Sequence, residues 1–346
     1  MIFTGDIALP SFSIKLPDTL PQSVTWVGNL EGSVVNGECE NKVTKGVYND
    51  YEAVKELLQH IPFKAFSLAN NHLLDFGTVK DSITRLQSLE VPSIGAGSIE
   101  EASKSLVVVD DDNLAYRILA FGWENIQCPQ ATEKRDGVNP LTKKNVLSTA
   151  KDALKNPEPV ICFMHWDYEL EKYPMPMDRC LAHELIDLGV SAIVGCHGHR
   201  VQQVEIYKNR PIVYGLGNFL FRQGVYFGGK LKYPTLSREE WAFEIKRNEC
   251  FYIHRFEYDN TKHELKYVEA IELSNQQFYG KAEYNDFSNE EYLDFFKKNR
   301  KVKKLLPVFT HKEKPFSYWS KSEWIKLRGW LLDTAMNLNL KSANRG

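Results

Sequence analysis

Five short apolar segments of this chain each lead directly into residues that can bind a metal ion or carry a proton. Each segment has the length and composition of a buried strand. Because rigid strands hold the side chains at their ends in convergent positions, this order predicts one polar site built from five distant segments. The junctions are Thr4-Gly5-Asp6, Val27-Gly28-Asn29-Leu30-Glu31-Gly32, Leu68-Ala69-Asn70-Asn71-His72 with Asp75, Met164-His165-Trp166-Asp167-Tyr168-Glu169, and Val194-Gly195-Cys196-His197-Gly198-His199.

The side chains at these junctions form a coherent set of metal ligands. Carboxylates, imidazoles and an amide oxygen suit divalent ions such as Mn, Fe, Zn or Co. Two ions roughly 3.5–4 Å apart can share a carboxylate, activate water and stabilise the attacking and leaving oxygens. Cys196 is either a soft ligand or a buried structural thiol, and we favour the structural interpretation. We therefore expect two divalent ions.

Each junction taken alone has an ordinary structural explanation. Asp6 could lie in a turn, Asn71 in a helix cap, and His165 could be a satisfied core histidine. The pair His197 and His199 is more specific, because packing rarely requires two imidazoles around one glycine. The occurrence of all five junctions at strand ends favours the metal site.

Alternating strand-like and helix-like segments predict an α/β layered domain over residues 1–275. Helix starts are indicated by Thr78 with Asp81 and by Ser98 with Glu101, and Gly189 closes a helical pattern. Further strands are expected at Leu106–Asp110 and Ala115–Phe121, which form a hairpin, and then at Trp241–Ile245, Phe251–Tyr258 and Leu265–Ile271.

Residues 276–346 form a predicted helical extension that is rich in basic and aromatic residues. Between Lys297 and Arg328 there are eleven basic and two acidic residues, although the whole chain has a formal net charge of only −2. One interpretation is a solvated helix face. The other, suggested by Trp and Phe among the Lys and Arg residues, is reversible docking of residues 288–346 at the inner face of the membrane or on an anionic partner. No nucleic-acid-binding motif accompanies the charge, so we expect no nucleic-acid partner.

At these residues the sequence resembles the capsule-synthesis CapA family, also called the poly-γ-glutamate biosynthesis family, of the calcineurin-like metallophosphoesterase superfamily. The resemblance covers roughly residues 1–221. It implies a four-layer αββα sandwich with a two-metal site, to which this chain adds a C-terminal β-hairpin region and a helical basic tail. The matching text is Thr4-Gly5-Asp6, Asn29-Leu30-Glu31-Gly32, Ala69-Asn70-Asn71-His72 with Asp75 and Gly77, His165-Trp166 with Glu169, His197-Gly198-His199, and Gly215-Leu216-Gly217-Asn218-Phe219.

The resemblance also implies a role for each site residue. Asp6 and His199 would bind one ion, and Glu31 would take the bridging position. The second ion would be completed by Asn71, His165 and His197. His72, oriented by Asp75, would protonate the leaving oxygen or stabilise the transition state. We separately expect Asn70, Asp167 and Glu169 to contact the substrate.

Three positions depart from the family pattern. Ala8 stands where superfamily phosphoesterases usually have a histidine, which implies a weaker first ion or a substitute ligand. Asp167 replaces a glycine and offers an extra ligand or a charge toward the substrate. Gly198 replaces a proline between the paired histidines, so the loop is expected to be less rigid.

These observations predict a metal-dependent hydrolase of capsule or surface-polymer biosynthesis. Its activated water would attack a phosphoester or a γ-glutamyl-type amide. The alternative is a non-hydrolytic, metal-containing subunit that binds or assembles the polymer. The N-terminus has no basic leader, so we expect a cytoplasmic protein, peripheral at the membrane if the tail docks there.

Overall fold

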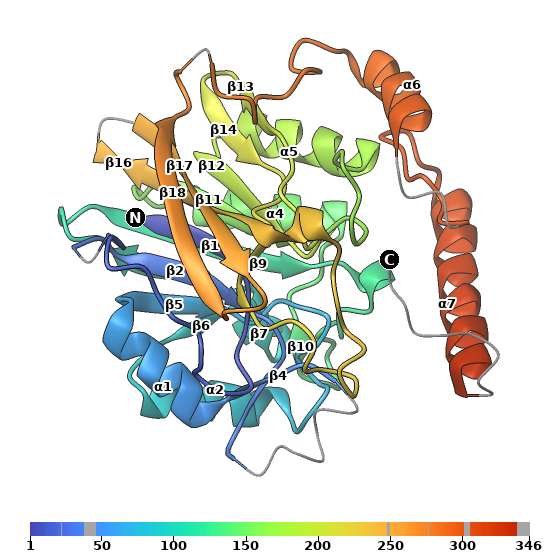
Figure 1. Ribbon diagram of the computed structural model, residues 1–346. Coiled ribbons are helices and arrows are strands. Elements are labelled where there is room, and N and C mark those ends of the chain that lie inside the picture. The colour runs from blue at the N-terminus through green and yellow to red at the C-terminus, as the bar shows by residue number, and fades with distance from the viewer. Residues whose placement is uncertain (22, 38–45, 248–249, 276, 301–304, 338–346) are drawn as a thin grey trace.

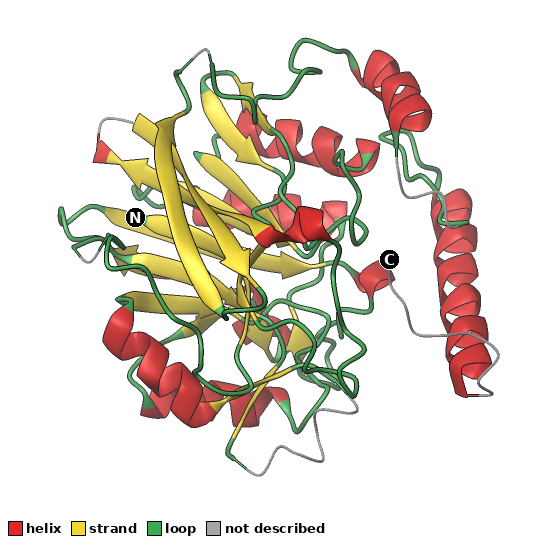
Figure 2. Cartoon of the chain, viewed as in Figure 1, coloured by secondary structure: helices red, strands yellow, loops and turns green. Residues whose placement is uncertain are grey.

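Two large β-sheets lie at the centre of the computed structural model and helices lie outside them (Figure 1). The structure describes all residues except 22, 38–45, 248–249, 276, 301–304 and 338–346. Figure 2 shows the same arrangement by secondary structure, with the strands gathered between the helices. The predicted α/β class is confirmed.

The first sheet has eight described strands in the order β18-β17-β16-β1-β2-β5-β6, with β15 also paired to β1. Its central strands are parallel and buried, which agrees with the near-continuous apolar runs in their sequences. Parallel to one another are β1 (Ile2–Ala8), β2 (Trp26–Leu30), β5 (Phe63–Ser67), β6 (Ser93–Ile94) and β15 (Asn218–Phe221).

The three strands expected after Phe221 are present, but they do not form a separate hairpin region. They are β16 (Glu239–Lys246), β17 (Cys250–Asp259) and β18 (Glu264–Glu272), and they run antiparallel. Because β16 pairs with β1, they extend the first sheet.

The second sheet has six described strands in the order β13-β14-β12-β11-β9-β8. The hairpin of β8 (Leu106–Val109) and β9 (Ala115–Gly122) is confirmed. The other strands are β11 (Val160–His165), β12 (Ala192–Cys196), β13 (Val204–Tyr207) and β14 (Arg210–Val213). Two short pairs, β3 (Ser33–Val35) with β4 (Tyr48–Asp50) and β7 (Ala96–Gly97) with β10 (Gly137–Val138), complete the described strands.

The two sheets pack on each other through apolar side chains. The rings of Phe3 in β1 and Phe163 in β11 meet edge to face with centroids 5.9 Å apart, and both are buried. On the outer sides, α2 contacts β6, whereas α4 contacts β9 and β11 with α5 beside it. The described helices of this part are α1 (Tyr51–His60), α2 (Val79–Ser88), α3 (Ile99–Ser103), α4 (Lys143–Ala153) and α5 (Pro176–Leu188), with 3-10 turns η1 (Glu124–Ile126) and η2 (Thr235–Arg238).

The predicted helix boundaries are confirmed by their caps. Thr78 and Asp81 form a capping box at the start of α2, and Ser98 forms one with Glu101 at the start of α3. Gly189 ends α5 with a φ of 112°, a left-handed conformation that favours glycine.

The C-terminal segment packs on the second sheet before it turns helical. The backbone N–H groups of Val204 and Ala282 donate to Gly280 and Val204, respectively. Two helices follow along one side of the molecule, α6 (Asn289–Asn299) and α7 (Pro315–Asn337) (Figure 1). The division into residues 1–275 and 276–346 remains a prediction. Among the described residues, no helix has both the length and the apolar character needed to cross a membrane.

Candidate metal centre

The predicted ligands converge where strands of both sheets end. Asp6 lies near the end of β1, and Glu31 directly follows β2. His165 is the last residue of β11. His197 and His199 follow β12. The centre therefore lies across the contact between the two sheets.

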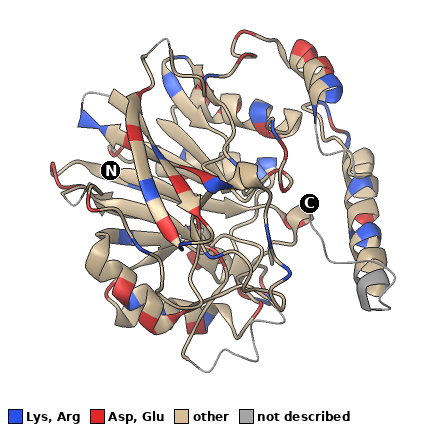
Figure 3. Cartoon of the chain, viewed as in Figure 1, with Lys and Arg blue, Asp and Glu red and all other residues tan. Residues whose placement is uncertain are grey.

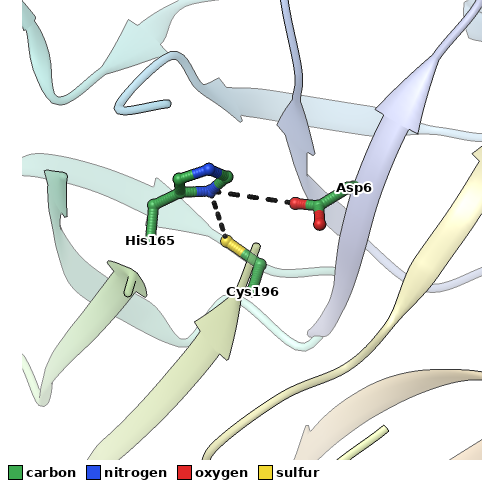
Figure 4. Close-up of side chains that lie close together, drawn as sticks. All are labelled: Asp6, His165 and Cys196. Atoms are coloured by element: carbon green, nitrogen blue, oxygen red, sulfur yellow. Dashed lines mark hydrogen bonds and ion pairs between the residues drawn. The ribbon is translucent and has the colours of Figure 1, made fainter. Parts of the chain in front are cut away.

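One potential metal-binding group consists of Asp6, His165 and Cys196, whose ligand atoms all lie within 4.8 Å of one another. His165 Nδ1 is 3.8 Å from Asp6 Oδ1 and 3.2 Å from Cys196 Sγ. Figure 4 shows the three side chains pointing toward one another. All three are buried, so an ion held here would be shielded from solvent.

A second group consists of Glu31, His197 and His199, again with ligand atoms within 4.8 Å of one another. His199 joins the two groups, because its Nε2 is 3.8 Å from Glu31 Oε1 and its Nδ1 is 3.6 Å from Asp6 Oδ2. The rings of His165 and His197 also lie close, with centroids 4.8 Å apart. The two groups are therefore neighbours.

The loop that carries the paired histidines has an unusual backbone. His197 has a φ of 89° and His199 a φ of 49°, both in the left-handed region that non-glycine residues seldom adopt. Such conformations cost of order 1–3 kcal/mol each and concentrate at functional sites. Asp6 Oδ2 accepts from the His197 N–H at 3.0 Å, and Asn218 Oδ1 lies 2.8 Å from His199 Nδ1. These contacts hold the strained loop in place.

Close backbone approach explains two of the glycines at the strand ends. A Cβ atom on Gly5 would lie 1.9 Å from the Gly217 carbonyl oxygen. A Cβ atom on Gly195 would lie 1.9 Å from the Tyr214 carbonyl oxygen. Only glycine lets these strands approach so closely, which brings Asp6 and Cys196 to the same place.

Burial perturbs the ionisation of the centre. Burial raises the pKa of the Asp6 carboxyl, and contacts with His199, the His197 N–H and Asn29 offset only part of that rise. Burial lowers the pKa of His165 well below 6.5 and also lowers that of His199, so both imidazoles are neutral at pH 7. Burial, followed by the nearby carboxylates Asp6 and Glu31, raises the pKa of the Cys196 thiol. Burial therefore disfavours a positive charge on the imidazoles of His165 and His199.

The donor set fits divalent cations. Neutral imidazoles, carboxylates and a thiol are ligands that Zn and related ions accept. Two buried atoms that could coordinate a metal ion, His199 Nε2 and Asn29 Oδ1, have no hydrogen-bond partner among the described residues. Buried polar atoms without partners are costly, and coordination would satisfy them.

Asn71 and His72 lie at the more accessible edge of the centre. Asn71 Oδ1 is 2.8 Å from His165 Nε2. His72 Nδ1 is 2.7 Å from Asp75 Oδ2, and His72 Nε2 is 3.7 Å from Glu31 Oε1. Asp75 Oδ2 also accepts from the Val47 N–H at 2.8 Å. Asp75 thus fixes the orientation of a histidine that faces the second group.

The three predicted substrate-binding residues occupy different environments. Asn70 is fully buried, and its Oδ1 accepts from the N–H groups of Gly32 and His72, so it connects two site loops. Asp167 is also buried; its Oδ2 accepts from Gln202 at 2.9 Å, and burial raises its pKa to about 8. Glu169 is partly exposed, and its charge favours the protonated form of His199. Their substrate role remains a prediction, and Glu169 is the most accessible of the three.

Aromatic side chains of residues 221–233 lie against histidines of the centre. The Tyr233 ring stacks on His199 with centroids 4.1 Å apart, and Phe227 lies 6.3 Å from the His72 ring. Ala8 is buried in the same apolar cluster as Phe221 and Tyr233. The sequence did not predict this contact, because nothing in the spacing of residues 222–233 indicates that they fold back onto the centre.

Comparison with known proteins identifies the family. The description "Bacterial capsule synthesis protein PGA_cap" applies to a family that matches residues 15–223, more than half of the chain. The chain belongs to this family. The resemblance drawn from the sequence is therefore confirmed.

Two curated relatives of the family are similar over part of their length. Capsule biosynthesis protein CapA of Bacillus anthracis is 31% identical over 206 residues, which cover 57% of this chain and 50% of the relative. PGA biosynthesis protein CapA of Bacillus subtilis (strain 168) is 29% identical over 240 residues, which cover 64% of this chain and 63% of the relative. The chain thus spans less than two thirds of the length of either relative.

A solved structure was also matched. The 5'-nucleotidase precursor from Thermus thermophilus aligns with 79% of this chain and 49% of that chain, at 13% identity and a TM-score of 0.38. Neither an activity nor a ligand follows for this chain from a match at that level.

Proposed function

We propose that this protein is a metal-dependent hydrolase of bacterial capsule or surface-polymer biosynthesis, built on a four-layer αββα fold of the metallophosphoesterase type. The observation that carries the proposal is the adjacency of two buried ligand groups, joined by His199, to an oriented His72–Asp75 pair. The packing of the sheets through Phe3 and Phe163, with α2 and α4 outside them, supports the layered fold.

The geometry supports separate roles for the metal ligands and for the residue that donates a proton. Asp6, Glu31, His165, His197, His199 and Cys196 would hold the ions, with Asn71 beside them. Divalent ions bound there would supply an activated water and stabilise negative charge on the substrate. His72 is 12% exposed at its side chain, so a leaving group can reach it. Asp75 holds the imidazole in a fixed orientation, which suits protonation of the leaving oxygen or nitrogen.

Two bonds are candidates for cleavage. The ligand set suits a phosphoester, because paired metal ions are common in phosphatases. The name of the Bacillus subtilis relative refers to PGA biosynthesis, which favours a γ-glutamyl amide. Fold alone does not choose between them.

Turnover should be measured on p-nitrophenyl phosphate, bis-p-nitrophenyl phosphate and γ-glutamyl-p-nitroanilide, with Mn, Fe, Zn or Co, alongside the metal content. We expect His72→Ala to lower turnover by about 10²–10⁴-fold while metal content stays unchanged. Asp75→Asn should produce a smaller loss. His60→Ala is the matched control, because His60 stacks on Phe12 at the end of α1.

The outcomes separate hydrolysis from the alternative function. Bound metal with no turnover on any substrate would favour a non-hydrolytic subunit that binds or assembles the polymer. A protein purified gently that neither contains nor takes up a divalent metal would contradict both functions.

A further inference from the structure

The helix α7 is attached to the rest of the protein along one face. The Tyr318 hydroxyl accepts from Trp123 Nε1 at 3.0 Å, and Lys321 Nζ donates to the Val308 carbonyl at 2.8 Å. Ser322, one helical turn after Tyr318, is buried. These contacts anchor the inner face of α7 next to η1.

The opposite face of α7 exposes large apolar side chains. Phe316 is 76% exposed, Trp319 57% and Trp330 63%, and Leu327 and Leu331 are about half exposed. At 3.6 residues per turn, these five positions fall within about one third of the helix circumference, so they lie on one side. We call these five residues the outer face of α7. On the inner face Tyr318 and Ile325 pack against the core, whereas described residues leave the outer face uncovered.

Exposed large apolar side chains are concentrated on this helix, although Tyr279 and Leu305 are also exposed in the C-terminal segment. Tyr292 and Phe296 of α6 are buried, and so is Phe309. The Tyr292 hydroxyl donates to the Pro174 carbonyl at 2.6 Å. The first half of the segment therefore packs against the rest of the protein. Of the residues 288–346 predicted to dock, α7 is the part that we consider further.

The charge around α7 selects an anionic occupant for the outer face. Along α7 basic positions alternate with an acidic one (Figure 3): Lys321, Lys326 and Arg328 are accompanied by Glu323, and further lysines precede the helix. The side chains of Lys312 and Lys326 are 73% and 54% exposed, and their ion pairs with Glu290 and Glu323 are exposed as well. Exposed pairs of this kind contribute only about 0–1 kcal/mol, so they do not prevent these lysines from meeting another anion.

The side-chain types favour lipid over a second copy of the chain. Tryptophan and phenylalanine beside lysine are typical of helices that lie in the headgroup region of a bilayer. A second copy would add the same predominantly basic segment, with eleven basic and two acidic residues between Lys297 and Arg328, and would therefore bring no complementary negative charge. We propose that the outer face of α7 docks peripherally on an anionic lipid surface, with its aromatic rings at the depth of the headgroups.

Co-sedimentation of the full chain with vesicles tests this docking. We expect binding to vesicles of equal parts phosphatidylcholine and phosphatidylglycerol at low salt, and little binding to phosphatidylcholine alone. Trp319→Ala/Trp330→Ala should weaken binding by at least about tenfold, because two interfacial rings are lost. The matched control is Tyr279→Ala/Leu236→Ala, which removes exposed apolar side chains from another surface.

Melting temperatures of both double variants should match that of the wild type, which shows that the fold is intact. No binding to the mixed vesicles, or equal loss in both double variants, would overturn the proposal. Equal binding to both vesicle types would overturn the anionic specificity. Concentration-dependent dimerisation without lipid that Trp319→Ala/Trp330→Ala abolishes would instead assign the outer face to a second copy.

Discussion

Two of the buried clusters of ionisable groups in the described structure differ in how they offset the cost of burying charge. In one, Arg179 and Glu205 form a fully buried ion pair, with Arg179 Nη2 2.6 Å from Glu205 Oε1. Burial alone would raise the pKa of Glu205, but hydrogen bonds from His183 and Arg179 outweigh it, and the pKa is lowered. At the metal centre the balance is reversed, and burial keeps the pKa of Asp6 raised.

The difference shows where each cluster obtains its positive charge. The first cluster contains its own cation, and the Tyr214 hydroxyl donates to Glu205 Oε2 at 2.6 Å. The candidate metal centre contains carboxylates, imidazoles and a cysteine but no arginine or lysine in either ligand group. The first cluster is therefore complete as folded, whereas the second is suited to a cation from solution.

Breaking the internal pair should have the largest effect on stability. Arg179→Met leaves a buried carboxylate without its guanidinium, so we expect a loss of about 3–5 kcal/mol. Urea unfolding monitored by circular dichroism measures it. Arg179→Met/Glu205→Leu should recover much of the loss, because no charge is then buried unpaired. A double variant no more stable than Arg179→Met would contradict this explanation.

Adding a divalent ion should stabilise the protein through the other cluster. At a free-ion concentration about 100 times Kd we expect a gain of about 2.7 kcal/mol. Asp6→Asn should abolish the gain, and Asp18→Asn, at an exposed position, should retain it. Without metal, Asp6→Asn should be at least as stable as the wild type, because it removes a costly buried carboxyl. A large loss of stability in metal-free Asp6→Asn would refute the comparison.

Glu240 is a buried carboxyl that belongs neither to the arginine cluster nor to the candidate metal centre. We expect it to make the stability of the protein depend on pH. Burial raises its pKa to about 8, and the Leu220 N–H donates to it at 3.4 Å. The folded state then keeps its proton longer than the unfolded chain, so stability falls as pH rises from about 4.5 to 8, by at most about 1.4 kcal/mol per pH unit. Glu240→Gln should remove this component from melting curves across that range. The exposed Glu56→Gln should leave the pH profile unchanged.

The stack of Tyr233 on His199 should have the smallest effect. Aromatic pairs contribute about 0.5–1.5 kcal/mol, so Tyr233→Ala should weaken metal binding by up to about tenfold. Tyr233→Phe keeps the ring and should bind like the wild type in calorimetry. Equal affinities for all three proteins would show that the ring does not orient His199.

The sequence predicted what depends on strand order and missed what depends on loops. Apolar runs in the sequence indicate the strands that position Asp6, Glu31 and His165. The convergence of these three residues could therefore be predicted. The role of Cys196, as a ligand or as a buried structural thiol, stays a prediction; its Sγ lies 3.2 Å from His165 Nδ1. The stacking of Tyr233 on His199 was not predicted, because a loop returning over distant residues leaves no periodic pattern.

The strands β16–β18 and α7 show the same limit. Alternating and helically spaced apolar residues predict the secondary structure of these elements. The same patterns do not predict which other elements they pack against. The sequence alone did not indicate that β16 would pair with β1, or that α6 would pack its aromatic rings inside while α7 exposes them.

The position of the ligands across the contact between the sheets has a mechanical consequence. Asp6 and Glu31 come from the first sheet, and His165 and Cys196 from the second, so an ion bound to both would act as a cross-link. Because the ion would bind the folded site and be released on unfolding, this link would stabilise the contact between the sheets by mass action. Amide hydrogen exchange should accordingly slow at the inner strands of both sheets when metal is added. The ion would then stabilise the contact between the sheets in addition to any role in catalysis.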